Sequence, residues 1–309
     1  MIKERSIRMR VSGLLSYGLQ VPDLEQGKDF YRTFGLDVAE RSGSLAVRCA
    51  GRDQDQTVLR EGADKRLHHV AFAIAPGTAA DFQRQLEGQG ITLIDGPGGD
   101  LDGGLWFRDP DGNLVSLREQ ELAPPRTPEP AAMNIPGSYS RVDDAQWLKA
   151  SEPARPRRLG HVLIFTSDND RAERFYGSAL GLRLSDRVPG AVSFMNSGPG
   201  DHHVFGFIQS SHSGLHHSSW EVDTIDQLGS GAQTMAESGH RLGWGLGRHT
   251  LGSNLFHYIR DPWGSWIEYF FDIDQISEDW EPREWHAPPA VWCPAIPEEF
   301  LQNHEPKPE

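Results

Sequence analysis

Residues 16–38, SYGLQVPDLEQGKDFYRTFGLDV, recur in altered form as residues 160–184, GHVLIFTSDNDRAERFYGSALGLRL. Each stretch starts with an apolar run typical of a strand. It then passes through an Asp-containing turn into a helical segment ending in Phe-Tyr, and finishes with Gly-Leu and a second strand-like run. Phe30-Tyr31 is matched by Phe175-Tyr176, 145 residues further along the chain. Similarity at such a distance indicates a duplicated structural unit.

Two more pairs of segments follow in the same order. LHHVAFAI (67–74) resembles LHHSSWEV (215–222), and FRDPDGNLVSLRE (107–119) resembles IRDPWGSWIEYFF (259–271). Asp-Pro-x-Gly is a turn signal, and the runs after it read as strands. Three matched elements predict a tandem duplication. We therefore predict an α+β fold of two domains, each built from two βαβββ modules.

The composition of the remaining segments sets the predicted boundaries. We assign residues 1–120 to a first domain, the Pro- and Ala-rich residues 121–156 to a linker, and residues 157–274 to a second domain. Residues 275–309 form a Pro-rich tail. A disordered tail seldom contains three tryptophans, so we expect most of it to dock on the second domain.

Charge and composition exclude several classes of protein. The 309 residues carry a formal net charge of −14, which disfavours nucleic acid and anionic membrane surfaces as partners. No apolar run approaches the length of about 20 residues that spans a bilayer. The start, MIKERSIRMRVSG, lacks the apolar stretch of a secretory signal. Cys49 and Cys293 are the only cysteines and argue against a disulfide framework, so we expect a cytoplasmic protein.

The duplication also singles out residues that could bind a metal. At three matched positions the second half has two histidines and a glutamate, whereas the first half keeps one histidine. The pairs are His161 against Tyr17, His217 against His69, and Glu268 against Ser116. Two histidines and one carboxylate suit non-haem Fe(II), because they leave three adjacent coordination positions open. The same set also binds zinc in metalloproteases.

Glu268 is the strongest single indication of this site. A carboxylate inside the aromatic run WIEYFF is costly to bury unless it is paired or bound to a metal. The histidine of the second strand is less certain, because His216 and His217 are adjacent and both faces of LHHSSWEV look partly buried. Neither strand alternation nor the repeat separates them, since His68-His69 is also a pair.

Four stretches resemble the type I extradiol ring-cleaving dioxygenases of the vicinal oxygen chelate superfamily, the catechol 2,3-dioxygenase group. They are LGHV (159–162), DHHVFGF (201–207), GLHHSSWEV (214–222) and GRHTLGSNLFHYIRDPWGSWIE (247–268). The last contains the family pattern of Gly-x-His, Tyr, Asp-Pro-x-Gly and Glu. His257 departs from it, because the family usually has an aliphatic residue or Phe there. The first half resembles the non-catalytic domain of the family, and the fold implied is the vicinal oxygen chelate fold.

The resemblance implies a metal site made of His161, His217 and Glu268, and it favours His217 over His216. It implies Fe(II) as the cofactor, with Mn(II) as an alternative, and a catechol and O2 as substrates, giving a semialdehyde. His203 matches the acid–base histidine of the family, with His202 as the alternative residue. His249 and Tyr258 match residues that hydrogen-bond the substrate or oxygen. Members are usually homo-oligomers, often tetramers.

Substrate preference is predicted from the residues of two segments, the loop before Gly-x-His and the tail. Relatives that accept carboxylated catechols resemble one another in having arginines in the loop before Gly-x-His and in the tail. Here that loop reads RLGWGLGRH, with Trp244 nearer the site, and the tail offers only Arg283. We therefore expect an uncharged catechol with an alkyl or aryl substituent. The tail could cover the pocket, or equally serve as surface packing or an oligomer contact.

Two alternative functions fit the same fold. A glyoxalase-like isomerase normally has four metal ligands with two carboxylates, whereas only one carboxylate accompanies the two histidines here. A non-catalytic protein of the bleomycin-resistance kind would bind an aromatic ligand and would not need the ligand set.

Overall fold

The computed structural model describes residues 9–128, 132–145 and 153–307. The first half consists of β1 (Gly13–Val21), α1 (Leu24–Thr33), β2 (Asp37–Arg41), β3 (Ser44–Arg48), β4 (Thr57–Glu61), β5 (Arg66–Ile74), α2 (Ala79–Glu87), the 3-10 turn η1 (Gly99–Leu101), β6 (Leu105–Arg108) and β7 (Leu114–Glu119). Its seven strands form one sheet in the order β2-β3-β4-β1-β5-β7-β6. In the second module one strand is reduced to a single bridge between Ile94 and Trp106.

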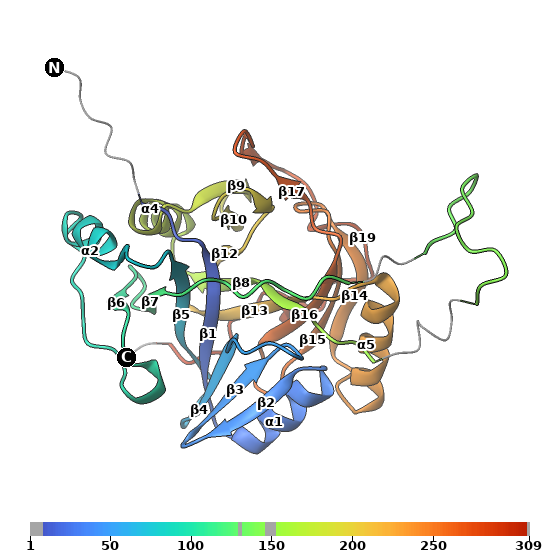
Figure 1. Cartoon of the computed structure of the whole chain (residues 1–309), viewed down its shortest axis with the longest axis horizontal. Coiled ribbons are helices and arrows are strands. Elements are labelled where there is room, and N and C mark those ends of the chain that lie inside the picture. Colours follow the sequence, from blue (N-terminus) through green and yellow to red (C-terminus); the bar gives the residue numbers. More distant parts are fainter. Residues whose placement is uncertain (1–8, 129–131, 146–152, 308–309) are drawn as a thin grey trace.

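The second half repeats this plan more completely. It consists of β8 (Arg158–Thr166), α4 (Asn169–Leu180), β9 (Arg183–Val188), β10 (Val192–Asn196), β11 (Gly200–Asp201), β12 (Phe205–Gln209), β13 (Gly214–Glu221), α5 (Ile225–Glu237), β14 (Gly243–His249), β15 (Leu255–Arg260) and β16 (Trp266–Phe271). The predicted α+β fold of paired βαβββ modules is confirmed. In both halves the modules join through an antiparallel pair, β1 with β5 and β8 with β13 (Figure 1).

Both repeat helices begin in the same way. Asp23 accepts a hydrogen bond from the backbone N–H of Gln26, and Asp168 accepts one from Arg171, each at 2.9 Å. An N-cap aspartate satisfies a backbone donor that the first turn leaves free. The Asp-containing turn of the repeat is therefore the start of α1 and of α4.

The two halves share one hydrophobic core. Phe34 stacks on Tyr269 with ring centroids 3.8 Å apart, and the Tyr269 hydroxyl donates to the Phe34 carbonyl. The Phe-Tyr motif also connects the halves, because the Tyr176 hydroxyl of α4 donates to Asp109 in the Asp-Pro-x-Gly turn of the first half at 3.0 Å. The first half lacks the candidate metal ligands, but its side chains and backbone pack against the second half and hydrogen-bond to it.

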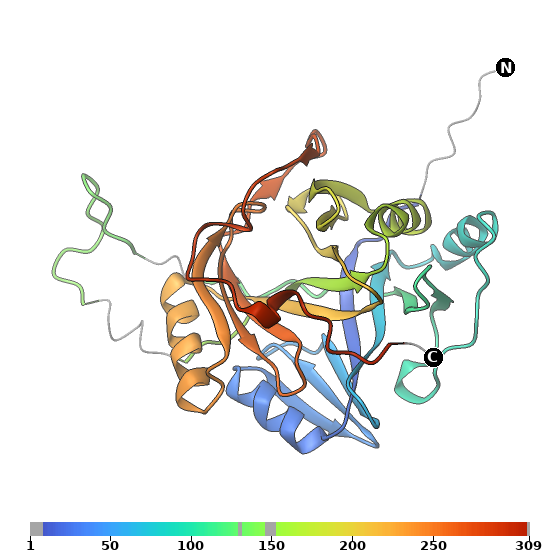
Figure 2. The same cartoon turned by 180° about the vertical axis from the view of Figure 1, so that it is seen from behind.

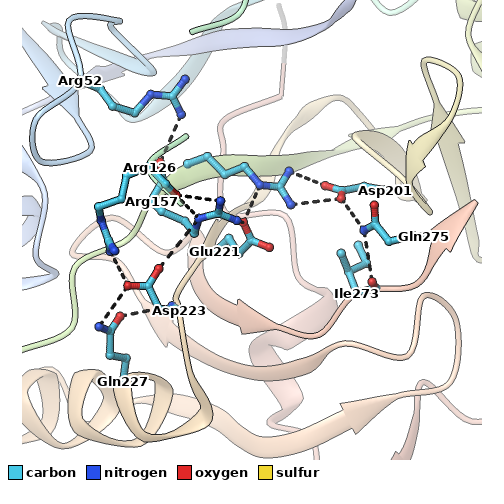
Figure 3. A network of polar contacts seen from close by, with 10 residues as sticks. Arg52, Arg126, Arg157, Asp201, Glu221, Asp223, Gln227, Ile273 and Gln275 are labelled. Carbon is cyan, nitrogen blue, oxygen red and sulfur yellow. Dashed lines mark hydrogen bonds and ion pairs between the residues drawn. The ribbon is translucent and has the colours of Figure 1, made fainter. Parts of the chain in front are cut away.

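Arginine–carboxylate contacts hold the two ends of the connecting segment against the body of the protein (Figure 3). Arg126 pairs with Asp223, while Arg157 pairs with Glu221 at 2.6 Å and also donates to the Arg126 carbonyl. Between these ends, residues 132–145 project away from both halves (Figure 1) and expose Met133, Ile135, Tyr139 and Val142.

The tail joins both edges of the second sheet. It contains β17 (Gln275–Ile276), β18 (Arg283–Glu284), β19 (Ala290–Trp292) and the 3-10 turn η2 (Glu298–Leu301). β18 pairs with β9 at one edge and β19 with β14 at the other, giving the order β18-β9-β10-β12-β8-β13-β16-β15-β14-β19. The tail consequently crosses the open side of the second half (Figure 2).

Two further observations concern the chain as a whole. Among the described helices, none is long and apolar enough to cross a membrane. Both cysteines are free thiols; Cys49 is buried and Cys293 is exposed. Burial raises the pKa of the Cys49 thiol to about 12.

Candidate metal centre

Three strands bring His161, His217 and Glu268 to one face of the second sheet. Ser219 of β13 lies opposite His161 of β8 and also opposite Glu268 of β16, so these residues form one row across three adjacent strands. His217 lies two residues before Ser219 and therefore faces the same side. The parallel pairing of β13 with β16 sets this register.

The potential ligand atoms of the three residues lie within 4.8 Å of one another, and all three residues are buried. Oε2 of Glu268 is 3.2 Å from Nε2 of His161 and 3.7 Å from Nε2 of His217. His217 Nε2 has no hydrogen-bond partner in the structure. A buried imidazole nitrogen without a partner, beside a fully buried carboxylate, fits a divalent metal bound by two histidines and one glutamate.

The charges at the site favour metal binding. Burial raises the pKa of Glu268, but the hydrogen bond from His161 and the other nearby imidazoles outweigh it, so the pKa lies below its ordinary value. Burial lowers the pKa of His217 well below its ordinary value, and His216 lowers it further. The site therefore offers an ionised carboxylate beside a neutral imidazole, which is the form that binds metal.

The equivalence of the two halves differs from our prediction at one position. β1 carries a bulge at Leu15 and β8 carries one at Gly160, so Ser16, not Tyr17, occupies the row equivalent to His161. Ser16 pairs with Ala71, which pairs with Ser116 in turn. The two bulges lie 145 residues apart, the same offset that relates Phe30-Tyr31 to Phe175-Tyr176, and this offset places Ser16 against His161. Our comparison of Tyr17 with His161 used an offset of 144 residues and was therefore one residue out of register.

The structure separates the members of the adjacent histidine pair on β13. His217 faces His161 and Glu268, whereas His216 lies at the bulge of β13 and contacts the tail. The ring nitrogens Nδ1 of His216 and His217 are 2.6 Å apart. The arrangement agrees with His217, the residue preferred from the resemblance.

The structure also distinguishes His203 from His202, because their side chains point in different directions. The His203 ring lies 4.3 Å from the His161 ring and lines the cavity beside the candidate ligands, while His202 points to Asp186, with Nε2 2.9 Å from Oδ2. Their Nδ1 atoms are 3.0 Å apart. Burial lowers the pKa of His203 well below its ordinary value, so the imidazole is neutral and able to accept a proton.

Asp186 is a functional candidate that our sequence reasoning missed, because it lies on β9, outside every matched segment. As an acceptor only, it requires His202 to donate through Nε2, which leaves His202 Nδ1 to accept from His203. The Asp186–His202 pair thereby orients His203 and exposes its Nε2 lone pair.

We expect Asp186→Asn to lower kcat about tenfold with KM nearly unchanged, because losing this orientation removes part of the 10²–10⁴-fold that a general acid–base contributes. Steady-state oxygen uptake would measure both constants. Asp170→Asn, at an exposed aspartate that pairs with Arg187 on the surface, is the matched control. Equal kcat values for the two variants would contradict the role of Asp186.

His249 and Tyr258 lie next to each other beside the candidate ligands. The Pro289 carbonyl can only accept, so Nδ1 of His249 donates to it at 3.0 Å, and Nε2 of His249 accepts from the Tyr258 hydroxyl at 2.9 Å. Burial and the charge of Glu268 raise the pKa of Tyr258 well above its ordinary value. Tyr258 therefore stays protonated and is available as a hydrogen-bond donor.

Two residues that hold Glu268 in place were also missed. The Ser219 hydroxyl donates to Oε2 of Glu268, and the Asn254 amide donates to Oε1 at 3.2 Å. Serine and asparagine are common in strands and loops, so no pattern in the sequence distinguishes them. The strand register alone reveals their position.

A cavity of about 420 Å³ opens onto the candidate ligands. Its walls are mostly apolar and come from the sheet and the tail; they include Leu163, Val192, Phe194, Ile208, Trp244, Leu251, Pro288, Pro289, Ile296, Phe300 and Leu301. Among the described residues that line it there is no lysine or arginine. Arg283 instead lies over the Trp280 ring. The tail therefore forms one wall of the cavity.

Comparison with known proteins places this geometry in a family. The sequence profile of the Glyoxalase/Bleomycin resistance protein/Dioxygenase superfamily matches residues 13–117 and 158–269, which are the two halves of the duplication. The chain belongs to this superfamily. Both matched segments end within the strand that follows an Asp-Pro-x-Gly turn, β7 in the first half and β16 in the second. The superfamily profile therefore covers the repeat and leaves out the linker and the tail.

Relatives within the superfamily support the resemblance to ring-cleaving dioxygenases. The chain is 39% identical to metapyrocatechase 2 of Cupriavidus necator over 308 residues, covering 96% of this chain and 94% of the relative. It is 26% identical to a manganese-dependent 2,3-dihydroxybiphenyl 1,2-dioxygenase of Geobacillus genomosp. 3, covering 86% and 87% of the two chains.

Solved structures show the same superfamily fold. The Mn(II)-bound glyoxalase from Novosphingobium aromaticivorans has a TM-score of 0.78 at 22% identity, covering 97% of this chain and 96% of that one. The 2,3-dioxygenase LapB from Pseudomonas sp. KL28 has a TM-score of 0.75 at 21% identity, covering 90% and 98%. At these identities the likeness establishes the fold.

Proposed function

We propose that the chain is an extradiol ring-cleaving dioxygenase. It opens the ring of an uncharged catechol with O2 at an Fe(II) ion bound by His161, His217 and Glu268, with Mn(II) as an alternative metal, and gives a semialdehyde. The observation that carries the proposal is the buried set of two histidines and one glutamate at an apolar cavity that also holds His203, His249 and Tyr258.

The metal, when bound, would act as a Lewis acid that lowers the phenol pKa of the catechol and would supply the redox chemistry that O2 requires. The apolar walls exclude water and accommodate an aromatic ring. Phe194, Leu251, Trp244 and Phe300 are among the residues that line the cavity. The protein thus supplies a dry pocket of aromatic size beside the residues that would hold the ion.

The remaining polar side chains handle protons and orientation. Nε2 of His203 is unligated and carries a lone pair, so it accepts a substrate proton and can return it to an oxygen atom. The Tyr258 hydroxyl, which donates to His249 in the structure, is free to donate to a substrate oxygen instead. These are the roles that the family resemblance predicted for the three residues.

Oxygen uptake tests the proposal directly. The protein, loaded anaerobically with Fe(II), is given a panel of catechols, and oxygen consumption is followed together with the appearance of a yellow semialdehyde. Uptake with yellow colour is the expected result. Absence of uptake with every catechol, despite stoichiometric metal, would refute the dioxygenase proposal.

We expect uncharged catechols to be preferred over carboxylated ones of equal size. A carboxylate in this cavity would be buried without a cation, which is unfavourable by several kcal/mol if no compensation occurs. The matched pair is 4-ethylcatechol and 3,4-dihydroxyphenylacetate, and we expect kcat/KM to be at least about tenfold higher for the first. A preference for the acid would show that a cation reaches the site.

The glyoxalase-like alternative is less well supported. Among the described residues, the cluster that could hold a metal has a single carboxylate, that of Glu268. A passive binding protein would not need His203 held by His202 and Asp186. Two assays separate a dioxygenase from a glyoxalase-like isomerase. A dioxygenase takes up O2 when loaded with Fe(II), whereas an isomerase turns over a thiohemiacetal when loaded with Zn or Ni.

A homo-oligomeric state, with a tetramer favoured, and a cytoplasmic location remain predictions. The exposed apolar side chains of residues 132–145 are compatible with an oligomer contact. Sedimentation of the purified protein would determine the oligomeric state.

A further inference from the structure

We propose that the C-terminal tail sets the protonation pattern of the metal centre. The Phe300 carbonyl, acting through His216, fixes the tautomer in which His217 presents its Nε2 lone pair to the metal. The buried ion pair between Lys65 and Glu305 holds that carbonyl in place. This inference rests on the metal centre of the proposed function and adds two positioning residues, His216 and Lys65, to it.

The hydrogen bonds allow one assignment of the protons. Nε2 of His216 lies 2.7 Å from the Phe300 carbonyl, which has no hydrogen to give, so His216 Nε2 carries the proton and donates. The two ring nitrogens of His216 contact the Phe300 carbonyl and the His217 ring, and neither partner is a carboxylate that would balance a second proton, so Nδ1 of His216 keeps its lone pair. That atom is 2.6 Å from Nδ1 of His217, which must be the donor.

The proton assignment of His216 determines that of His217, the candidate metal ligand. Once Nδ1 of His217 carries the proton, its Nε2 is a bare lone pair, and this is the nitrogen that is buried without a partner and faces Glu268. Metal-ligating histidines usually donate their other N–H to an acceptor that fixes the ring and raises its basicity. Here the acceptor is a second histidine, oriented in turn by the tail.

Packing holds the Phe300 carbonyl on His216. The buried Phe300 ring lies 4.9 Å from the ring of His216, 4.9 Å from that of Tyr258 and 4.6 Å from that of Trp244, measured between centroids. Phe300 of η2 therefore packs between His216 and the aromatic side chains of Trp244 and Tyr258 at the cavity. A shift of η2 would move both the wall and the hydrogen bond.

An ion pair with the first half anchors this segment. Nζ of Lys65 lies 2.5 Å from Oε1 of Glu305, and both side chains are buried. Oε1 of Glu305 also accepts from the backbone N–H of Leu215 at 2.8 Å, and Oε2 accepts from that of Leu67 at 2.9 Å. Leu67 and Leu215 immediately precede the His-His pairs of the two halves. The carboxylate thus fastens the tail to the same position in both repeats.

Manganese binding tests the relay without relying on turnover. Mn(II) alone is titrated into the metal-free protein, and its dissociation constant is measured from the EPR signal of free Mn(II). We expect His216→Leu to raise the dissociation constant about 10- to 100-fold, the usual range when an outer partner of a ligand is lost. His68→Leu, at the repeat-equivalent position that faces no ligand set, should leave it unchanged.

A conservative variant distinguishes the relay from loss of packing. The amide of His216→Gln can still donate to Phe300 and accept from His217, so we expect it to recover most of the affinity lost in H216L. Equal dissociation constants for the parent, H216L and H68L, each shown to be folded by circular dichroism, would overturn the proposal. Weaker Mn(II) binding in H216L without catechol cleavage by the parent would leave the relay intact and refute only the dioxygenase function.

The anchor is tested by histidine tautomers in the metal-free protein. ¹⁵N NMR of labelled histidines should show His216 protonated at Nε2 in the parent. We expect Glu305→Gln to shift this resonance toward a tautomer average and to weaken Mn(II) binding, while Glu298→Gln, at an exposed carboxylate of the same turn, changes neither. An unshifted His216 resonance in folded E305Q would contradict the anchoring role. If E305Q does not fold, the Mn(II) titration of H216L still tests the role of His216, because that variant keeps the ion pair between Lys65 and Glu305.

Discussion

Glu268→Gln is expected to abolish oxygen uptake with every catechol. The substitution keeps the shape of the side chain but removes the only carboxylate of the ligand set. His161 and His217 alone then hold the ion, so the affinity should fall by more than the roughly 100-fold that loss of an outer partner costs. Fe(II) content after desalting and the oxygen electrode would both report the loss.

The control for Glu268 uses the duplication. Ser116 occupies the equivalent row of the first half, so Ser116→Ala changes the same place in the sheet without touching the centre. It should retain the metal and the activity of the parent. If E268Q retained metal and turned over catechol, another acidic group would have to complete the site, and the ligand assignment would be wrong.

His203→Gln is expected to lower kcat about 10²- to 10⁴-fold while the metal stays bound, because an amide has no titratable lone pair to accept and return a proton. The ring of His203 lies beside His161 without ligating, so Fe(II) content should match the parent. Single-turnover experiments with anaerobic enzyme–catechol complexes mixed with O2 would locate the loss after substrate binding.

His240 provides the comparison for His203. It is a partly buried histidine that follows α5 in the chain and packs against Phe30 of α1. His240→Gln should leave kcat unchanged within about twofold. Equal kcat values in H203Q and H240Q would exclude His203 from proton transfer, whereas loss of metal in H203Q would instead make it a ligand.

Much of the fold could be predicted because the chain contains it twice. The matched strands, the Asp caps of α1 and α4, and the Asp-Pro-x-Gly turns are local features with local causes. The ligand set was also accessible, since a comparison between the halves exposes Glu268 against Ser116. The pairing of His161 with Tyr17 was wrong although the correct one was accessible, because the 145-residue offset between Phe30-Tyr31 and Phe175-Tyr176 already places Ser16 against His161.

The partners of the ligands could not be predicted from the sequence. Asp186, Ser219 and Asn254 act through side-chain contacts with residues 14 to 49 positions away in the chain, and nothing in their own surroundings marks them. The tail was recognised as a docking segment from its tryptophans. It reaches the cavity, however, through Pro289 and Phe300, whose carbonyls contact His249 and His216, and backbone acceptors leave no signal in a sequence.

The register of the first sheet shows why the candidate metal centre is not repeated in the first half. Ser16, Ala71 and Ser116 form the row that His161, Ser219 and Glu268 form in the second half, so the backbone still presents the positions of a second site. The room is gone, however, because the His69 ring lies directly over Gly18, where any Cβ would meet it. The second half has Leu163 at that place and keeps its hollow. The first half therefore lacks two of the candidate ligands and the space beside them, and its contribution to the second half is structural support.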